Sequence, residues 1–100
     1  MSGAPTDLEV SDDAARHRYE ARLDGALAGF ATYQLTDGGI TFLHTKTLPA
    51  FEGHGVASRL ARAALDDARR RHLRVTPRCP FFAQYIEHHP DDAGLVEGSG

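Results

Sequence analysis

The stretch TLPAFEGHGVASRL, residues 47–60, decides the fold of this 100-residue chain. An apolar segment runs into a proline, then into two glycines two positions apart, and then directly into an amphipathic pattern. Gly53 and Gly55 lack a Cβ, so the backbone there can adopt positive φ and approach a ligand closely. The helix that follows leaves its first N–H groups unpaired at the positive end of its dipole. This arrangement predicts an anion-binding loop, although glycines also serve in tight turns.

The composition is that of one ordinary globular domain, with 41% hydrophobic and 25% charged residues. A single cysteine excludes an internal disulfide, and no Cys/His spacing typical of a metal site occurs, so we expect no metal. No segment approaches the roughly 20 apolar residues that a membrane span needs, and no signal peptide is visible. We therefore expect a cytoplasmic protein that does not contact membranes.

Nucleic acid is not an expected partner either. The formal net charge is −3, and the arginines are concentrated between Arg59 and Arg74. Arg62 with Asp66, Asp66 with Arg70, and Asp67 with Arg71 have the i,i+4 spacing of ion pairs on a helix surface. Surface pairing therefore explains the arginine run, and the strongly basic footprint of a general nucleic-acid binder is missing.

Periodicity predicts the elements along the chain. Alternating patterns separated by glycine-containing turns predict three strands joined by hairpins at 17–23, 26–35 and 40–48. From Val56 the apolar period becomes three to four, which predicts a helix that ends near His72. A strand at 73–77 returns after this crossover helix and should lie parallel to the strand at 40–48.

A second helix follows, for which Pro80 suits the first turn and Pro90 marks the end. The order β-β-β-α-β-α indicates an α/β (α+β) fold with a mixed sheet of four to five strands. The helix-forming and strand-forming patterns define a domain at 16–96. Residues 1–15 and 97–100 are rich in small and charged residues and are expected to be loose ends.

Several short motifs point to one family. Residues 52–57, Glu-Gly-His-Gly-Val-Ala, fit the last positions of a signature that reads Gln or Arg, two residues, Gly, one residue, then Gly or Ala. Further matching runs are His44-Thr45, Cys79-Pro80-Phe81, Tyr85-Ile86 and His89-Pro90. From about Tyr19 to Val96, the chain thus resembles the GNAT superfamily of acyl-CoA-dependent N-acetyltransferases, especially its small single-domain members. Two departures are Glu52, where Gln or Arg is usual, and Lys46, where an acid is frequent.

The resemblance implies acetyl-CoA as cosubstrate, with backbone amides at the start of the crossover helix around its pyrophosphate. It further implies that the strand at 40–48 splays from the strand at 73–77 and pairs its open edge with the pantetheine arm. The Leu48 N–H is then the expected donor to the thioester oxygen. The expected cofactor-binding residues are Thr47, Leu48, Gly53, His54, Gly55, Val56, Ala57 and Ser58.

Three residues are candidates for the chemistry. Cys79 stands before Pro80 at a helix start, where the dipole favours a thiolate that could transfer a proton or carry the acetyl group; its alternative role is that of an inert, small hydrophobic residue. The resemblance makes Tyr85 a donor to the leaving thiolate, with simple packing as its alternative role. His44 shares a face with Ile40 and Phe42 by strand alternation; it is either a general base or a histidine held in the sheet.

These features predict an acetyl-CoA-dependent N-acetyltransferase that acts on a primary amine. A chain of this length lacks the added helices and loops of larger relatives, which predicts an open cleft and a protein lysine or a polyamine as acceptor. The alternative is a CoA- or acyl-CoA-binding module with little turnover, because Glu52 opposes a polyanionic cofactor.

Overall fold

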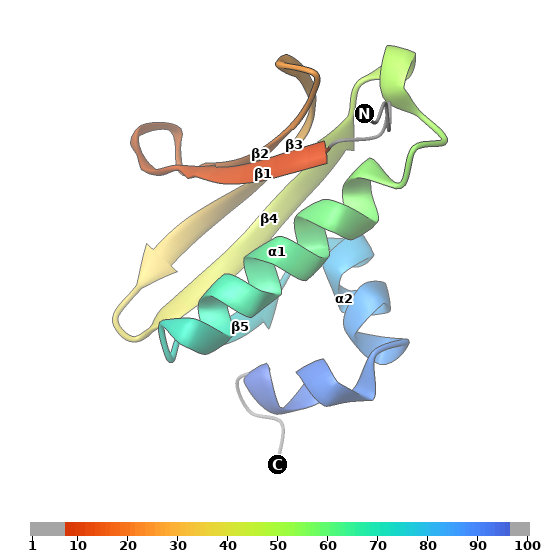
Figure 1. Ribbon diagram of the computed structural model, residues 1–100. Helices are drawn as coiled ribbons and strands as arrows, with labels where there is room; N and C mark the ends of the chain where they lie inside the picture. The colour runs from red at the N-terminus through yellow and green to blue at the C-terminus, as the bar shows by residue number, and fades with distance from the viewer. Residues whose placement is uncertain (1–7, 97–100) are drawn as a thin grey trace.

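The computed structural model describes residues 8–96 of the chain. Its five strands form one sheet in the order β1-β2-β3-β4-β5, and all neighbouring strands are antiparallel except β4 and β5, which are parallel. The expected mixed sheet, crossover helix and C-terminal helix are confirmed (Figure 1). The strands are β1 Leu8–Asp13, β2 Arg18–Leu23, β3 Ala26–Thr36, β4 Gly39–Thr47 and β5 Arg74–Pro77, and the α-helices are α1 Val56–Arg70 and α2 Pro80–Glu87.

Strand β1 corrects the expectation that residues 1–15 are loose. Leu8–Asp13 pairs along its whole length with β2, and a short 3-10 helix, Ala14–Arg16, connects the two strands. Leu8 is buried and Val10 packs against the same core. The segment is mostly polar, so it becomes a strand through pairing with β2 and not through a strong pattern of its own. Residues 1–7 and the tail at 97–100 lie outside the described part of the chain.

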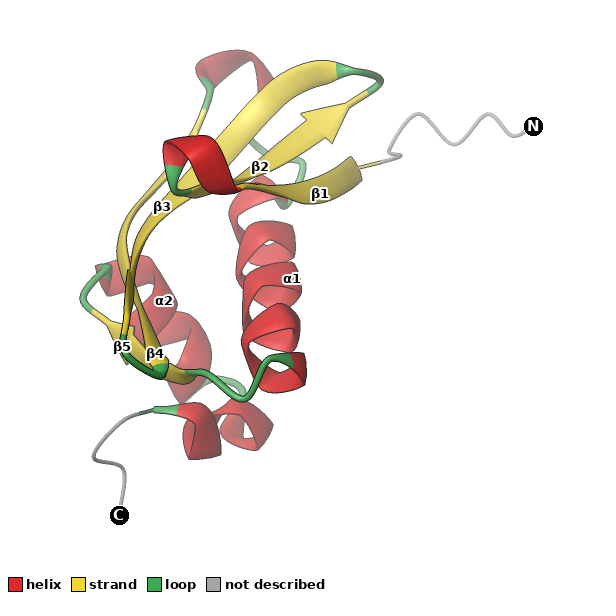
Figure 2. Ribbon diagram, turned by 90° about the vertical axis from the view of Figure 1, so that its left-hand side faces the viewer, coloured by secondary structure: helices red, strands yellow, loops and turns green. Residues whose placement is uncertain are grey.

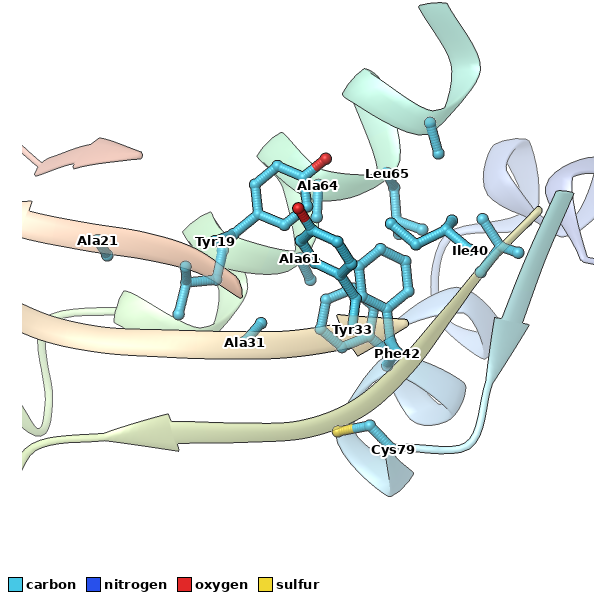
Figure 3. Packing of buried hydrophobic residues seen from close by; sticks show 14 of the residues in the cluster. Tyr19, Ala21, Ala31, Tyr33, Ile40, Phe42, Ala61, Ala64, Leu65 and Cys79 are labelled. Carbon is cyan, nitrogen blue, oxygen red and sulfur yellow. The ribbon is translucent and has the colours of Figure 1, made fainter. Parts of the chain in front are cut away.

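One face of the sheet carries both α-helices. The rings of Tyr19, Tyr33 and Phe42 lie between the strands and α1 (Figure 3). The ring of Phe42 also stacks on Phe82 of α2 at 4.2 Å between centroids. The Tyr19 hydroxyl donates to Asp67 of α1 at 2.6 Å. Burial, reinforced by this hydrogen bond, raises the pKa of Tyr19 far above its ordinary value, so the hydroxyl stays protonated. The strands bend around α1 (Figure 2).

The opposite face of the sheet, called the outer face below, is not covered by either α-helix. Directly opposed residues of neighbouring strands share a face. The register therefore places two rows of side chains on the outer face: Arg18, Thr32 and His44 in one, and Glu20, Phe30 and Lys46 in the other. None of the helices within residues 8–96 is long and apolar enough to cross a membrane.

The arginines of α1 form the expected surface ion pairs only in part. Arg62 pairs with Asp66 at 3.5 Å, but Arg62 also binds Asp92, which is fully buried in the 3-10 helix Pro90–Leu95. Arg69 contacts the other carboxylate oxygen of Asp92 at 2.8 Å. Two guanidinium groups thus compensate a buried carboxylate and tie the C-terminal segment to α1.

Gly29 of β3 sets how closely α1 approaches the sheet. A Cβ at this position would lie 2.6 Å from the Lys46 carbonyl oxygen and 2.8 Å from Cγ1 of Val56, the first residue of α1. We expect Gly29→Ala to lower the free energy of unfolding by about 3 kcal/mol, because backbone atoms must move to relieve the overlap. Thermal denaturation measures this loss. Gly94→Ala is the control, since a Cβ there has no atom within 4 Å, and an equal loss in both variants would contradict the explanation.

Candidate functional site

The loop between β4 and α1 has the geometry of an anion site. Gly53 and Gly55 have φ of 89° and 70°, and a Cβ on either would point into open space. Gly55 is the N-cap of α1, and no side chain caps the helix. Arg59 N–H is bonded to the Gly55 carbonyl, so the amides of residues 56–58 have no partner within the helix. The positive end of a 15-residue helix is therefore open to a ligand.

A surface pocket of about 210 Å³ lies at this helix end. It is lined by Thr47, Glu52, Gly53, Gly55, Val56, Ala57 and Ser58. The pocket thus brings together six of the eight residues expected to bind the cofactor, whereas His54 is exposed beside it and Leu48 does not line it. Because the free amides favour an anion and the Glu52 carboxylate opposes one, this side chain weakens the site.

Strand β4 contains a bulge that the alternating pattern did not reveal. Tyr33 is opposite Phe42, but Thr32 is opposite His44, so Leu43 is an additional residue in β4. As a result Phe42 remains buried in the core while His44 is exposed on the outer face. The expectation that His44 shares a face with Phe42 and Ile40 is therefore wrong.

The splay of β4 from β5 leaves part of β4 without a neighbouring strand. The two strands pair only from Gly39 with Arg74 to Phe42 with Pro77. The Cys79 N–H then donates to the Phe42 carbonyl at 2.9 Å and ends the ladder. Residues 43–47 have β3 on one side and, among the described residues, no strand on the other. We call this stretch the open edge.

The open edge presents different amides from those expected. The Leu48 N–H donates to the Ala28 carbonyl at 2.8 Å, on the β3 side, and is not available to a ligand. Successive N–H groups of a strand point to opposite edges, so the amides of Thr47 and Thr45 point away from β3. At this edge the amides of these two threonines, and not that of Leu48, are thus turned toward the side without a strand. Thr45 was not among the expected site residues.

Cys79 lies beside the open edge. Figure 3 shows Cys79 next to β4. Cys79 is 3% exposed, and its sulfur is 3.2 Å from Oγ1 of Thr45. Thr45 is opposite Ala31, which belongs to the buried core, so this contact lies on the helix side of the sheet. Cys79 is also the N-cap of α2, which begins with Pro80 as expected. Cys79 and His44 thus border the same edge from opposite faces.

The ring contacts of Tyr85 described here are with His89 and Arg62, and not with residues of the open edge. Its ring stacks on His89 at 3.9 Å between centroids, and the guanidinium carbon of Arg62 is 5.6 Å from the ring centre. Tyr85 lines a second pocket of about 320 Å³ together with Ser58, which also lines the loop pocket. The sequence predicted the helix α2 correctly. It did not predict which side of α2 faces α1, because that depends on tertiary packing.

The described residues contain no group of three His, Cys, Asp or Glu side chains that could hold a metal ion. The features described above are a helix end, a strand edge and single polar side chains.

Known proteins are similar to this chain in sequence. The sequence model of the GCN5-related N-acetyl-transferase family matches residues 18–95. The chain belongs to this family. Protein NATD1 of Bos taurus is 30% identical over 93 residues, covering 88% of this chain and 82% of that protein. Protein NATD1 of Gallus gallus is 29% identical over 85 residues, covering 83% and 77%. The resemblance that the short motifs indicated is thus confirmed, and the family match extends over residues 18–95.

A solved structure supports the same fold for this GCN5-related chain. It is a ribosomal-protein-alanine N-acetyltransferase from Brucella melitensis biovar Abortus 2308, which superposes with a TM-score of 0.60 at 22% identity. The match covers 72% of this chain but 59% of that one, so the chain spans less than two thirds of that enzyme's length.

Proposed function

We propose that this protein is an N-acetyltransferase that uses acetyl-CoA and transfers the acetyl group to a primary amine. The observation that carries the proposal is the continuous path from the uncapped end of α1 along the open edge of β4 to Cys79. This path joins an anion site to a row of backbone donors that ends at a thiol. Membership in the GCN5-related N-acetyl-transferase family also supports the proposal.

The residues of the path fit the two chemical parts of acetyl-CoA. The amides of residues 56–58 would hold the diphosphate, and Gly53 and Gly55 would let it approach closely. The amides of Thr45 and Thr47 would pair with the pantetheine arm as a neighbouring strand does. The cosubstrate supplies an activated acetyl group as a thioester, and one of these amides would donate to the developing oxyanion.

His44 and Cys79 divide the proton transfers between the two sides of the edge. The helices cover one side, so the amine would arrive from the outer face, where His44 is exposed. His44 would accept the proton that the amine loses. Cys79, on the helix side, would donate its thiol proton to the departing sulfur and regain a proton from solvent. Its contact with Thr45 at the edge favours it over Tyr85 for this role.

Calorimetric titration with CoA and with acetyl-CoA tests the proposal, followed by acetyl transfer to a panel of amines. We expect saturable binding of both compounds and transfer to at least one amine. Binding of CoA without consumption of the thioester would instead indicate a CoA-binding module with little turnover. No binding at millimolar concentration would contradict both functions.

Glu52 offers a direct test of the anion site. Its carboxylate lines the loop pocket, so it would repel a bound diphosphate. We expect Glu52→Gln to lower the Kd of CoA about fivefold, which corresponds to roughly 1 kcal/mol of repulsion removed in a solvated site. Glu87→Gln is the matched control, because Glu87 is exposed on α2 and does not line this pocket. Equal affinities of the two variants, measured by calorimetry, would place the diphosphate elsewhere.

A further inference from the structure

The outer face borders the open edge on the side from which an acceptor would arrive. Its two rows of side chains run from β2 across β3 to β4 and end at His44 and Lys46. Leu43, the bulged residue next to His44, is 43% exposed, and Phe30 is half-buried. The surface around the reacting edge is therefore part of this face, and its charges act on any acceptor that binds there.

Positive charge is in excess in the two rows of the outer face. Glu20 is 4% exposed, and both of its carboxylate oxygens are occupied, by Arg18 at 2.8 Å and by Arg22 at 2.9 Å. The guanidinium of Arg18 holds the pKa of the Glu20 carboxyl below its usual range, so Glu20 is ionised and fully paired. Lys46 is exposed and forms no ion pair with any residue between 8 and 96. The rows thus offer unbalanced cations and no unpaired carboxylate.

Apart from Glu20, the acidic side chains that the register places on this face, among residues 8–96, lie at its far edge. Glu9 and Asp13 of β1 are opposite Arg22 and Arg18, and β1 lies three strand spacings, roughly 14 Å, from β4. Asp13 is already paired with Arg16 at 3.1 Å. At moderate salt this separation exceeds the Debye length of about 10 Å, so these carboxylates contribute little at the open edge.

We propose that the acceptor amine belongs to an acidic polypeptide segment, whose carboxylates bind Lys46 and the arginines of the outer face. This inference rests on the acyl-transfer function proposed above and chooses between the acceptors that the sequence left open. A polyamine would bring several positive charges against Lys46 and find no free carboxylate in the two rows. An acidic segment matches the charge of the face, and the exposed Leu43 provides an apolar contact beside it. The Phe30 ring is covered by the Arg18 guanidinium, whose carbon lies 4.6 Å from the ring centre.

Competing acceptors test the proposal. Peptides with one central lysine flanked by Asp, Ser or Arg, together with spermidine, would be assayed with acetyl-CoA at low and high salt. We expect kcat/KM for the Asp-flanked peptide to exceed that for the Arg-flanked peptide by at least about tenfold, and the difference to shrink at high salt. Spermidine should be a poor acceptor.

Variants locate the preference on the outer face. Lys46→Glu should reverse the order of the acidic and basic peptides, whereas Arg70→Gln should keep it. Arg70 is 74% exposed on α1, on the other side of the sheet. A fluorescent Asp-rich peptide without lysine gives a readout independent of turnover. Its anisotropy should report binding to the wild type and to Arg70→Gln, and loss of binding to a folded Lys46→Glu.

The outcomes separate this inference from the proposed function. Preference for spermidine or for the Arg-flanked peptide, or an order unchanged by Lys46→Glu, would overturn the acidic acceptor while leaving acyl transfer in place. Self-association that Lys46→Glu abolishes would assign the outer face to a second copy of the chain and would also overturn it. Absence of CoA binding by calorimetry would remove the acyl-transfer function and the inference together.

Discussion

Replacement of Gly55 by alanine is expected to raise the Kd of CoA by about tenfold to a hundredfold, the equivalent of about one hydrogen bond to a charged group. Gly55 has φ of 70° and lines the loop pocket, where a Cβ would meet no protein atom. The added methyl group would therefore occupy space that the diphosphate needs for contact with the amides of α1. Calorimetry with CoA measures the affinity.

Gly38→Ala is the matched control for backbone strain. Gly38 has φ of 78° in the turn between β3 and β4, and a Cβ there also has open space. Both alanine variants should lose about 1–2 kcal/mol of stability, because an L-residue is strained at positive φ. Only Gly55→Ala should lose affinity for CoA. If both variants bind CoA like the wild type, the diphosphate does not lie on this helix end.

The features that the sequence predicted well depend on local chemistry. Proline, two glycines and an amphipathic period determine the loop and the start of α1 within a few residues, and the helix indeed begins at Val56. The parallel placement of β5 follows from the crossover rule and is also observed. Neither feature requires knowledge of which strands pair in which register.

The features that the sequence did not predict depend on strand pairing. An additional residue at Leu43 shifts everything after it by one position, which moves His44 to the outer face and turns the Leu48 amide toward β3. Alternation along one strand carries no signal for such a shift. Thr45 entered the motifs only as the neighbour of His44, and its contact with Cys79 depends on the path of the chain after β5.

These corrections make the chemistry of the edge more specific. If His44 had faced the core, this proposed base and Cys79 would have lain on the same face of the sheet. The imidazole would then have competed with the helices for space. The bulge instead leaves an exposed imidazole on the side where an amine can arrive and a buried thiol on the other. In the proposed reaction, the two proton transfers would thus have separate groups on separate sides of one strand.

Cys79→Ala is expected to lower kcat by about a hundredfold to ten-thousandfold, the range typical of a lost acid–base group. The Kd of CoA should change little, since Cys79 does not line the loop pocket. The buried sulfur contacts Thr45, so its removal leaves a small cavity, and thermal denaturation must show that the variant is folded at the assay temperature.

Tyr85→Phe is the comparison that assigns the proton donor. It removes only the hydroxyl, while the stacking on His89 is retained, and we expect kcat to stay within about threefold of the wild-type value, which is too small a change for a lost general acid. If kcat falls strongly in Tyr85→Phe but stays at the wild-type value in Cys79→Ala, the proton donor is Tyr85 and not Cys79.

Mass spectrometry separates the two possible roles of Cys79. If the thiol carries the acetyl group, the protein gains the mass of one acetyl group when acetyl-CoA is present without an amine. Proton donation by Cys79 requires two results together: the wild-type protein stays unmodified, and kcat is lowered in Cys79→Ala.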